Sequence, residues 1–233
     1  MNEDILTKSL PDGGPLYRET NLNAFIAEPW NAGSSVVFIL IAFYLIWKTQ
    51  RIKTLPLLLK IAPVILLIGG IGGTLYHAFR VSSFFLFLDV APIYTLVFGV
   101  ACAFWIRWTG KPVLLLGILP FFILMDLLIF YVFPLDEQIK QHLSYVNMAA
   151  AAVIPLAGML VREKFRMAHV AVLALLGYGT GLTCRVLDAM EPPVMAVGTH
   201  WLWHVICAFS SLLLMEFMIR FFVQPRPARV VSL

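Results

Sequence analysis

The chain has 233 residues, of which 61% are hydrophobic and only 13% are charged. A soluble domain of this length needs far more polar surface, so this composition excludes an ordinary soluble globular protein. The formal net charge is +4, but the basic residues are distributed as membrane topology requires, and we expect no nucleic-acid partner. The polar N-terminus predicts no cleavable signal peptide.

Seven apolar stretches, each bounded by charges, Pro or Gly, follow one another along the chain. They cover residues 32–47, 57–79, 84–106, 112–133, 144–161, 168–187 and 197–222. A bilayer core requires about 20 apolar residues per helical span, and lipid offers no partners to unpaired backbone groups. The sequence therefore predicts an all-α integral membrane protein. We expect an N-terminal segment at 1–31, a seven-transmembrane helix bundle at 32–222 and a tail at 223–233.

Lysine and arginine are unequally shared between the two sides of this predicted bundle. The side of the N-terminus carries five of the 17: Lys8, Arg18, Arg80, Lys140 and Arg185. The opposite side carries the other twelve: Lys48, Arg51, Lys53, Lys60, Arg107, Lys111, Arg162, Lys164, Arg166, Arg220, Arg226 and Arg229. The positive-inside rule then predicts a cytoplasmic C-terminus and an N-terminus that is extracytoplasmic or lumenal.

The three cysteines, Cys102, Cys184 and Cys207, lie within apolar stretches and have no paired spacing. We therefore expect neither a disulfide nor a cysteine-based zinc site.

Three histidines are predicted to lie at one depth in the membrane. His77 ends the second stretch, which runs outward, and His200 and His204 begin the seventh, which runs inward. An i, i+4 spacing places the last two rings on one helix face, about 6 Å apart. Three neutral imidazoles with an open fourth position are the ligands of a catalytic zinc site. A lone histidine is more often structural, so the third ring at matching depth carries the prediction.

Two further histidines are less informative. His142 is expected near the same face, where it could substitute as a ligand, and His169 is expected at the cytoplasmic interface.

Asp89 begins the third stretch, which enters from the outer face. A carboxylate beside a zinc-activated water can accept its proton and return it to a leaving group. It could also orient a ligating imidazole, or merely stabilise the start of a helix through the helix dipole.

Other polar side chains within the stretches have more local explanations. Glu216 stands four residues before Arg220, and Arg185 three before Asp188, so each spacing favours an ion pair within one helix. Asp126 lies in the middle of the fourth stretch, and the sequence names no partner for it.

Short motifs between about residue 17 and residue 210 resemble those of the alkaline ceramidases. They are Glu19-Thr20-Asn21, Ala27-Glu28-Pro29-Trp30-Asn31, Ser34-Ser35, Tyr76-His77, Leu88-Asp89, Pro92-Ile93 and His200 with His204. The later motifs are shared more broadly with a superfamily of seven-helix membrane hydrolases that includes the adiponectin receptors. Their order and spacing together are specific.

The resemblance implies zinc held by His77, His200 and His204, a water activated with help from Asp89, and hydrolysis of the amide bond of a ceramide. It also implies a calcium ion beside the zinc pocket. Side-chain oxygens of Glu19, Asn21 and Glu28 and the backbone carbonyl of Tyr17 would bind it, because oxygen ligands suit Ca²⁺.

Two positions depart from the family pattern. Leu16 stands where family members carry an Asp that would be a further calcium ligand, and Gly73 stands where they carry a Ser. Thr74 is the adjacent hydroxyl and the candidate for stabilising an oxyanion, although one helical residue is a rotation of about 100°.

The leading hypothesis is a zinc-dependent intramembrane hydrolase that cleaves ceramide or a related acyl-amide lipid, with no obligate protein partner. The alternative is a seven-helix receptor or interaction protein with a mainly structural zinc site. A haem protein ranks low, because an i, i+4 pair cannot ligate opposite faces of one haem. A retinal protein is disfavoured because the seventh stretch has no lysine.

Overall fold

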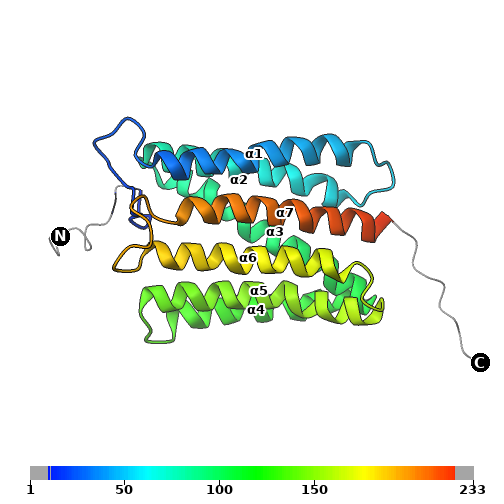
Figure 1. Ribbon diagram of the computed structural model, residues 1–233. Helices are drawn as coiled ribbons and strands as arrows, with labels where there is room; N and C mark the ends of the chain where they lie inside the picture. The colour runs from blue at the N-terminus through cyan, green and yellow to red at the C-terminus, as the bar shows by residue number, and fades with distance from the viewer. Residues whose placement is uncertain (1–9, 11, 224–233) are drawn as a thin grey trace, which may run out of the picture. The chain divides into compact units, whose positions relative to one another are not determined.

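The computed structural model describes residue 10 and residues 12–223, apart from the side chains of residues 137, 138, 141 and 142. This part of the chain is helical and contains no strand. Its elements are α1 (Pro29–Gln50), α2 (Leu57–Phe79), α3 (Ser83–Thr109), the 3-10 helix η2 (Pro112–Leu114), α4 (Leu115–Tyr131), α5 (Glu137–Arg162), α6 (Ala168–Asp188) and α7 (His200–Val223) (Figure 1). The outermost residues of the predicted N-terminal segment, and the predicted tail after residue 223, lie outside the described residues.

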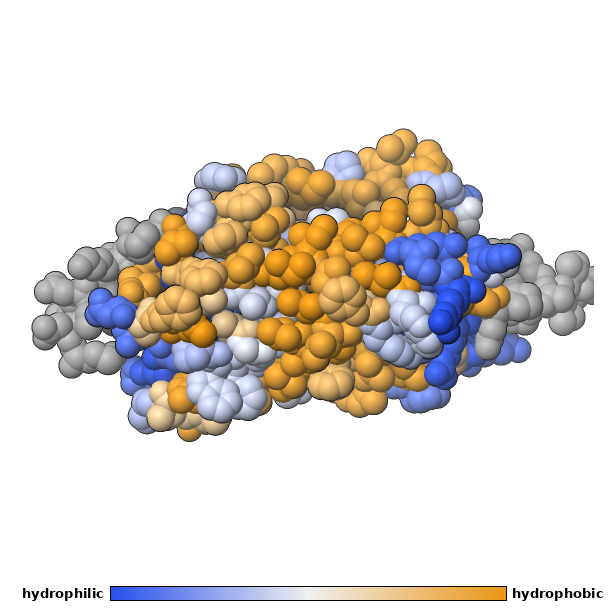
Figure 2. All heavy atoms as spheres, turned by 90° about the horizontal axis from the view of Figure 1, so that it is seen from above, coloured by the Kyte–Doolittle hydropathy of each residue, from blue (hydrophilic) through white to orange (hydrophobic). Residues whose placement is uncertain are grey.

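Within the described chain, seven helices are long and apolar enough to cross a membrane. Large hydrophobic side chains stand exposed on them, such as Leu40 and Phe43 on α1. Hydrophobic surface gathers over the middle of the helices, and hydrophilic residues gather toward their ends (Figure 2). The hydrocarbon interior of a membrane accounts for this pattern, because a protein in water rarely exposes so large a hydrophobic surface. The prediction of an all-α protein with seven membrane-length helices is confirmed, while the orientation of its termini stays a prediction.

The helix ends follow the apolar stretches with two instructive differences. The fourth stretch is divided into two elements, because the 3-10 helix η2 begins at Pro112 and α4 follows it. The fifth helix begins at Glu137 rather than at residue 144, since two polar turns extend it beyond the apolar stretch. Four helices contain a proline in their interior, at Pro63, Pro92, Pro120 and Pro155. Prolines of this kind are tolerated in membrane helices, where neighbours re-satisfy the freed backbone groups.

The chain divides into two compact units, residues 1–92 together with 169–233, and residues 93–168. In the first unit α1 packs against α2 and α7, and α2 also contacts α7. Near the C-terminal ends of α1 and α7, Glu216 pairs with Arg220 at 3.5 Å and also with Lys48. The predicted pair within α7 is thus confirmed, and the bond to Lys48 ties it to α1. Apart from His142, the possible substitute ligand, every predicted zinc, calcium and catalytic residue belongs to this first unit.

In the second unit α4 packs against α5. Its apolar core contains Ala101, Phe122 and Ala151, and the indole of Trp105 donates a hydrogen bond to the carbonyl of Ala151 at 3.1 Å. Oδ1 of Asp126 is buried there without a hydrogen-bond partner among the described residues.

Candidate metal centre

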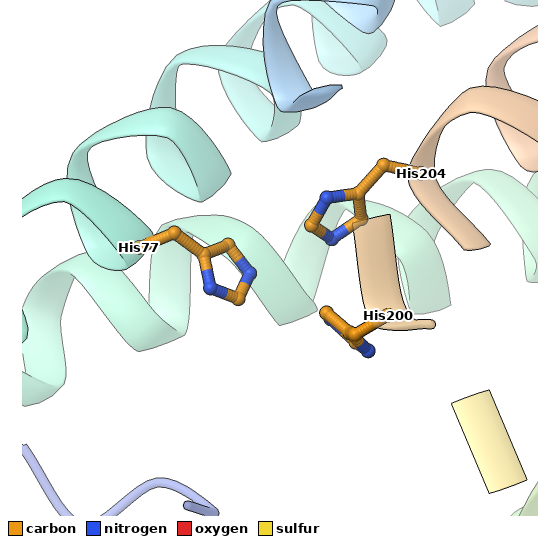
Figure 3. A group of neighbouring side chains, drawn as sticks. All are labelled: His77, His200 and His204. Carbon is orange, nitrogen blue, oxygen red and sulfur yellow. The ribbon is translucent and has the colours of Figure 1, made fainter. Parts of the chain in front are cut away.

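His77, in the last turn of α2, meets His200 and His204, in the first turns of α7. One ligand atom from each ring lies within 4.8 Å of the others, and all three residues are buried. The ring centroids are 4.9 Å apart for His77 and His204, and 4.7 Å apart for His200 and His204. Figure 3 shows the rings of His77 and His204 pointing toward one another, with His200 beside them. The predicted convergence of these side chains is confirmed.

The position of the α7 rings depends on the end of α6. Oδ1 of Asp188 accepts hydrogen bonds from the backbone N–H groups of Thr199 at 2.6 Å and His200 at 3.0 Å. The first turn of a helix has free N–H groups that a carboxylate can satisfy. Asp188 therefore determines where α7 begins, and with it the position of His200 and His204. The sequence had suggested only Arg185 as a partner for Asp188.

Hydrogen bonds at Nδ1 determine which ring nitrogen of His77 and of His204 is left for a ligand. Nδ1 of His204 lies 3.1 Å from the carbonyl oxygen of Asn31 and 2.9 Å from Oγ of Ser34. A carbonyl oxygen only accepts, so Nδ1 carries the ring proton and Nε2 carries the lone pair. Nδ1 of His77 lies 2.5 Å from Oε2 of Glu28, which accepts in the same way. Both rings therefore present an unprotonated Nε2.

Two ring nitrogens of the cluster are orphaned. Nε2 of His77 and Nδ1 of His200 are buried, and neither has a hydrogen-bond partner within the described chain. A buried polar atom without a partner costs about 1–3 kcal/mol, and such exceptions in native proteins call for an explanation. A metal ion bound among the three rings would give the orphaned Nε2 of His77 a partner. Three neutral imidazoles are a ligand set that suits zinc and leaves its fourth position open.

Asp89 lies against the face of α2 that carries His77. A Cβ atom placed on Gly73 would stand 2.5 Å from Oδ1 of Asp89 and 3.3 Å from Oγ of Ser35. Gly73 precedes His77 by one turn, so the two positions share a helix face. The missing side chain at Gly73 is thus what lets the carboxylate of Asp89 approach α2 beside the cluster.

The hydroxyl of Thr74, the other predicted catalytic group, donates a hydrogen bond to the carbonyl of Gly70 at 2.8 Å. Its proton is therefore directed along its own helix. Stabilisation of an oxyanion by Thr74 stays a prediction that requires this hydroxyl to turn.

Two of the residues expected around calcium take part in local backbone structure. Oε2 of Glu19 accepts from the N–H of Trp30 at 2.9 Å and Oε1 from the N–H of Asn31 at 2.6 Å, which caps α1. The side-chain oxygen of Asn21 accepts from the N–H of Asn23 at 3.1 Å. These oxygens already satisfy free backbone donors.

The other two lie closer to the histidines. Glu28 is fully buried between Arg80, which contacts Oε1, and His77, which contacts Oε2. The carbonyl of Tyr17 accepts from the N–H of Thr20 at 3.1 Å. The ring of Tyr17 is tilted against two rings of the cluster, with its centroid 4.1 Å from that of His200 and 5.2 Å from that of His77. The family resemblance suggested Tyr17 for its carbonyl, whereas its ring lies against two histidines of the cluster.

The sequence did not reveal the role of Arg80, which it counted only as a topological charge. Arg80 follows His77 by three residues and is fully buried against Asp12 and Glu28. A basic residue directly after an apolar span is ordinary, so nothing in the pattern distinguished it. His169 is exposed at the start of α6. The side chain of His142, the possible substitute ligand, lies outside the described residues.

No protein-family model matches the chain, and a search of curated protein sequences found no match.

Proposed function

We propose that this protein is a zinc-dependent intramembrane hydrolase that cleaves the amide bond of ceramide or a related acyl-amide lipid. The products would be a fatty acid and a sphingoid-type base. The observation that carries the proposal is the buried group of three imidazoles with two orphaned nitrogens, next to the carboxylate of Asp89. Such a site suits hydrolysis, and its place at the ends of membrane-length helices suits a lipid substrate.

His77, His200 and His204 would hold the ion. When bound, zinc supplies Lewis acidity that polarises a carbonyl oxygen and lowers the pKa of a water molecule toward 7.

The protein's own residues then divide the remaining work. Asp89 accepts the proton that water loses as its oxygen bonds to the amide carbon, and returns it to the nitrogen as the carbon–nitrogen bond breaks. Glu28 and the carbonyl of Asn31 hold His77 and His204 in the tautomer that presents Nε2. The ring of Tyr17 covers the cluster and limits the access of bulk water.

The test is direct assay of purified protein with ceramide in nanodiscs. Mass spectrometry should detect fatty acid and sphingoid base in equal amounts, and the His204→Ala protein should yield neither. His169→Ala is the matched control, because this exposed histidine stands outside the cluster, and it should retain both zinc and turnover. Full activity in a metal-free His204→Ala protein would rule the proposal out.

A receptor or interaction protein with a structural zinc site is the second candidate. It is favoured by the absence of a side chain at Gly73 and by the bond that occupies the hydroxyl of Thr74. Neither Gly73 nor Thr74 therefore offers a free side-chain hydroxyl to an oxyanion beside Asp89. Zinc-loaded protein that cleaves no member of a panel of ceramides and other acyl amides would favour this second function.

A further inference from the structure

Arg80 is bound on several sides by side chains and backbone of the first unit. Its Nε donates to Oδ2 of Asp12 at 2.6 Å, and one terminal nitrogen donates to Oδ1 of Asp12 at 3.1 Å and to the carbonyl of Pro15 at 2.9 Å. The other terminal nitrogen contacts Oε1 of Glu28. The guanidinium also lies 4.6 Å from the ring centroid of Tyr76. This fork geometry, with two carboxylates at once, is one that arginine but not lysine can satisfy.

These contacts continue to the metal ligands. Glu28 contacts Arg80 through one carboxylate oxygen and His77 through the other. Asp12, Arg80, Glu28 and His77 therefore form one buried chain, in which all four side chains are fully shielded. Burial would lower the pKa of Arg80, but its hydrogen bonds to Asp12 and the charge of Glu28 outweigh this and raise it, so the guanidinium stays charged.

The backbone at Arg80 is also unusual. This residue ends α2 in the left-handed conformation, with φ 54° and ψ 36°. Glycine commonly fills this position, because a Cβ atom makes the conformation unfavourable. Residues kept in such conformations are held by their surroundings and are frequent at functional sites. Here the residue in this conformation has a side chain that binds two carboxylates, and a glycine would have no side chain to do so.

The same contacts bear on the calcium ion that the family resemblance implies. A calcium site needs six to eight oxygen ligands, and Glu28 is the candidate ligand nearest the histidines. Its Oε1 already contacts a guanidinium, and a second cation at that oxygen would be repelled. Glu19 and Asn21 satisfy backbone donors, and Leu16 offers no side-chain oxygen. The expected residues do not fit calcium in this arrangement.

We propose that Arg80 is a positioning residue for the metal centre, in which its guanidinium serves as the fixed cation beside Glu28 and excludes calcium. It links the N-terminal segment to the zinc ligand His77 without a second metal ion. The proposal concerns metal binding alone, so it holds or fails separately from lipid hydrolysis.

The first measurement uses the unaltered zinc-loaded protein with terbium, a luminescent stand-in for calcium. We expect no saturable terbium luminescence and no calcium retained on equilibrium dialysis. Stoichiometric binding of either ion beside the zinc would overturn the proposal, whatever the behaviour of any variant.

The second measurement compares variants that differ in one step. Leu16→Asp introduces the carboxylate that the alkaline ceramidases carry at this position and keeps Arg80, so this variant should not bind terbium. The double variant, Leu16→Asp with Arg80→Gln, should bind it. Equal terbium binding by the two would show that Arg80 excludes nothing. Leu16→Asp with Arg80→Lys, which keeps a positive charge, should again exclude terbium.

The third measurement tests positioning through the ligands. Cobalt-substituted Arg80→Gln protein should have an altered visible absorption spectrum and about 10- to 100-fold weaker metal affinity, the range seen when a ligand's supporting partner is lost. Arg18→Gln is the matched control, because Arg18 forms its ion pair with exposed Glu191 at 2.7 Å. An Arg80→Gln protein with the spectrum and affinity of Arg18→Gln would refute the positioning role.

Discussion

Oε2 of Glu28 accepts a hydrogen bond from Nδ1 of His77 at 2.5 Å, and both side chains are fully buried. The residues are 49 positions apart in sequence. The bond joins the segment before α1 to the end of α2 and determines which nitrogen His77 offers to a ligand. A carboxylate in this position also raises the basicity of the imidazole.

Glu28→Gln should therefore weaken zinc binding by about 10- to 100-fold, because the neutral amide is a poorer acceptor and no longer balances Arg80. Competition with a chromogenic chelator measures the affinity. The corresponding change at exposed Glu191, Glu191→Gln, should leave it unchanged. Equal affinities for the two proteins would contradict the role of Glu28.

Removal of the metal should destabilise the protein, because the three rings would stay buried, two of them with an orphaned nitrogen. A ligand present at 1,000 times its dissociation constant stabilises the folded state by about 4 kcal/mol. Thermal unfolding in detergent should shift to lower temperature after chelation and return when zinc is restored. His204→Ala should not respond to either step, whereas His169→Ala should respond like the unaltered protein. A chelated protein that unfolds at the original temperature would speak against a metal in this cluster.

Asp89→Asn should retain zinc and lose turnover by about 10²- to 10⁴-fold, the usual contribution of a proton-transferring group. The amide keeps the size of the side chain but cannot accept the proton. Elemental analysis and kcat should be measured on the same preparation, with exposed Asp136→Asn as the control. Loss of both zinc and activity would instead indicate that Asp89 has a structural role in the metal site.

Gly73→Ala should lower activity and destabilise the protein by about 1–3 kcal/mol, the usual cost of overpacking. Its new methyl group would meet Oδ1 of Asp89 at 2.5 Å and displace the carboxylate. Gly33→Ala in α1 is the matched change, because nothing lies within 4 Å of the added atom. There the better helix propensity of alanine should stabilise α1 by about 0.5–1 kcal/mol. Similar effects of the two substitutions on unfolding and turnover would show that Gly73 is not a contact position.

The charge distribution predicts that the metal centre faces the non-cytoplasmic side. A cysteine introduced at exposed Val81, between α2 and α3, should react with an impermeant maleimide in right-side-out vesicles. One introduced at exposed Thr54, between α1 and α2, should react only after permeabilisation. The reverse pattern would invert the topology while leaving the site itself intact.

Much of the architecture follows from short-range pattern. An apolar stretch of membrane length has to form a helix, because lipid cannot satisfy its backbone, and so α2 coincides with the predicted residues 57–79. The i, i+4 spacing of His200 and His204 sets their common face, since that geometry is local to α7. Opposite chain directions of the second and seventh stretches bring His77 to the same depth. The histidine cluster was predictable for these reasons.

Only the tertiary structure decided how the segment before α1 engages this cluster. The chain there forms turns without periodicity, so the sequence could not tell that Glu28 would be shared between His77 and Arg80, or that Asp12 would reach Arg80. It likewise could not tell that Asp188 would cap α7, or that Gly73 would make room for Asp89. Each of these contacts joins residues from different elements, and their pairing depends on how the helices pack rather than on the preferences of neighbouring residues.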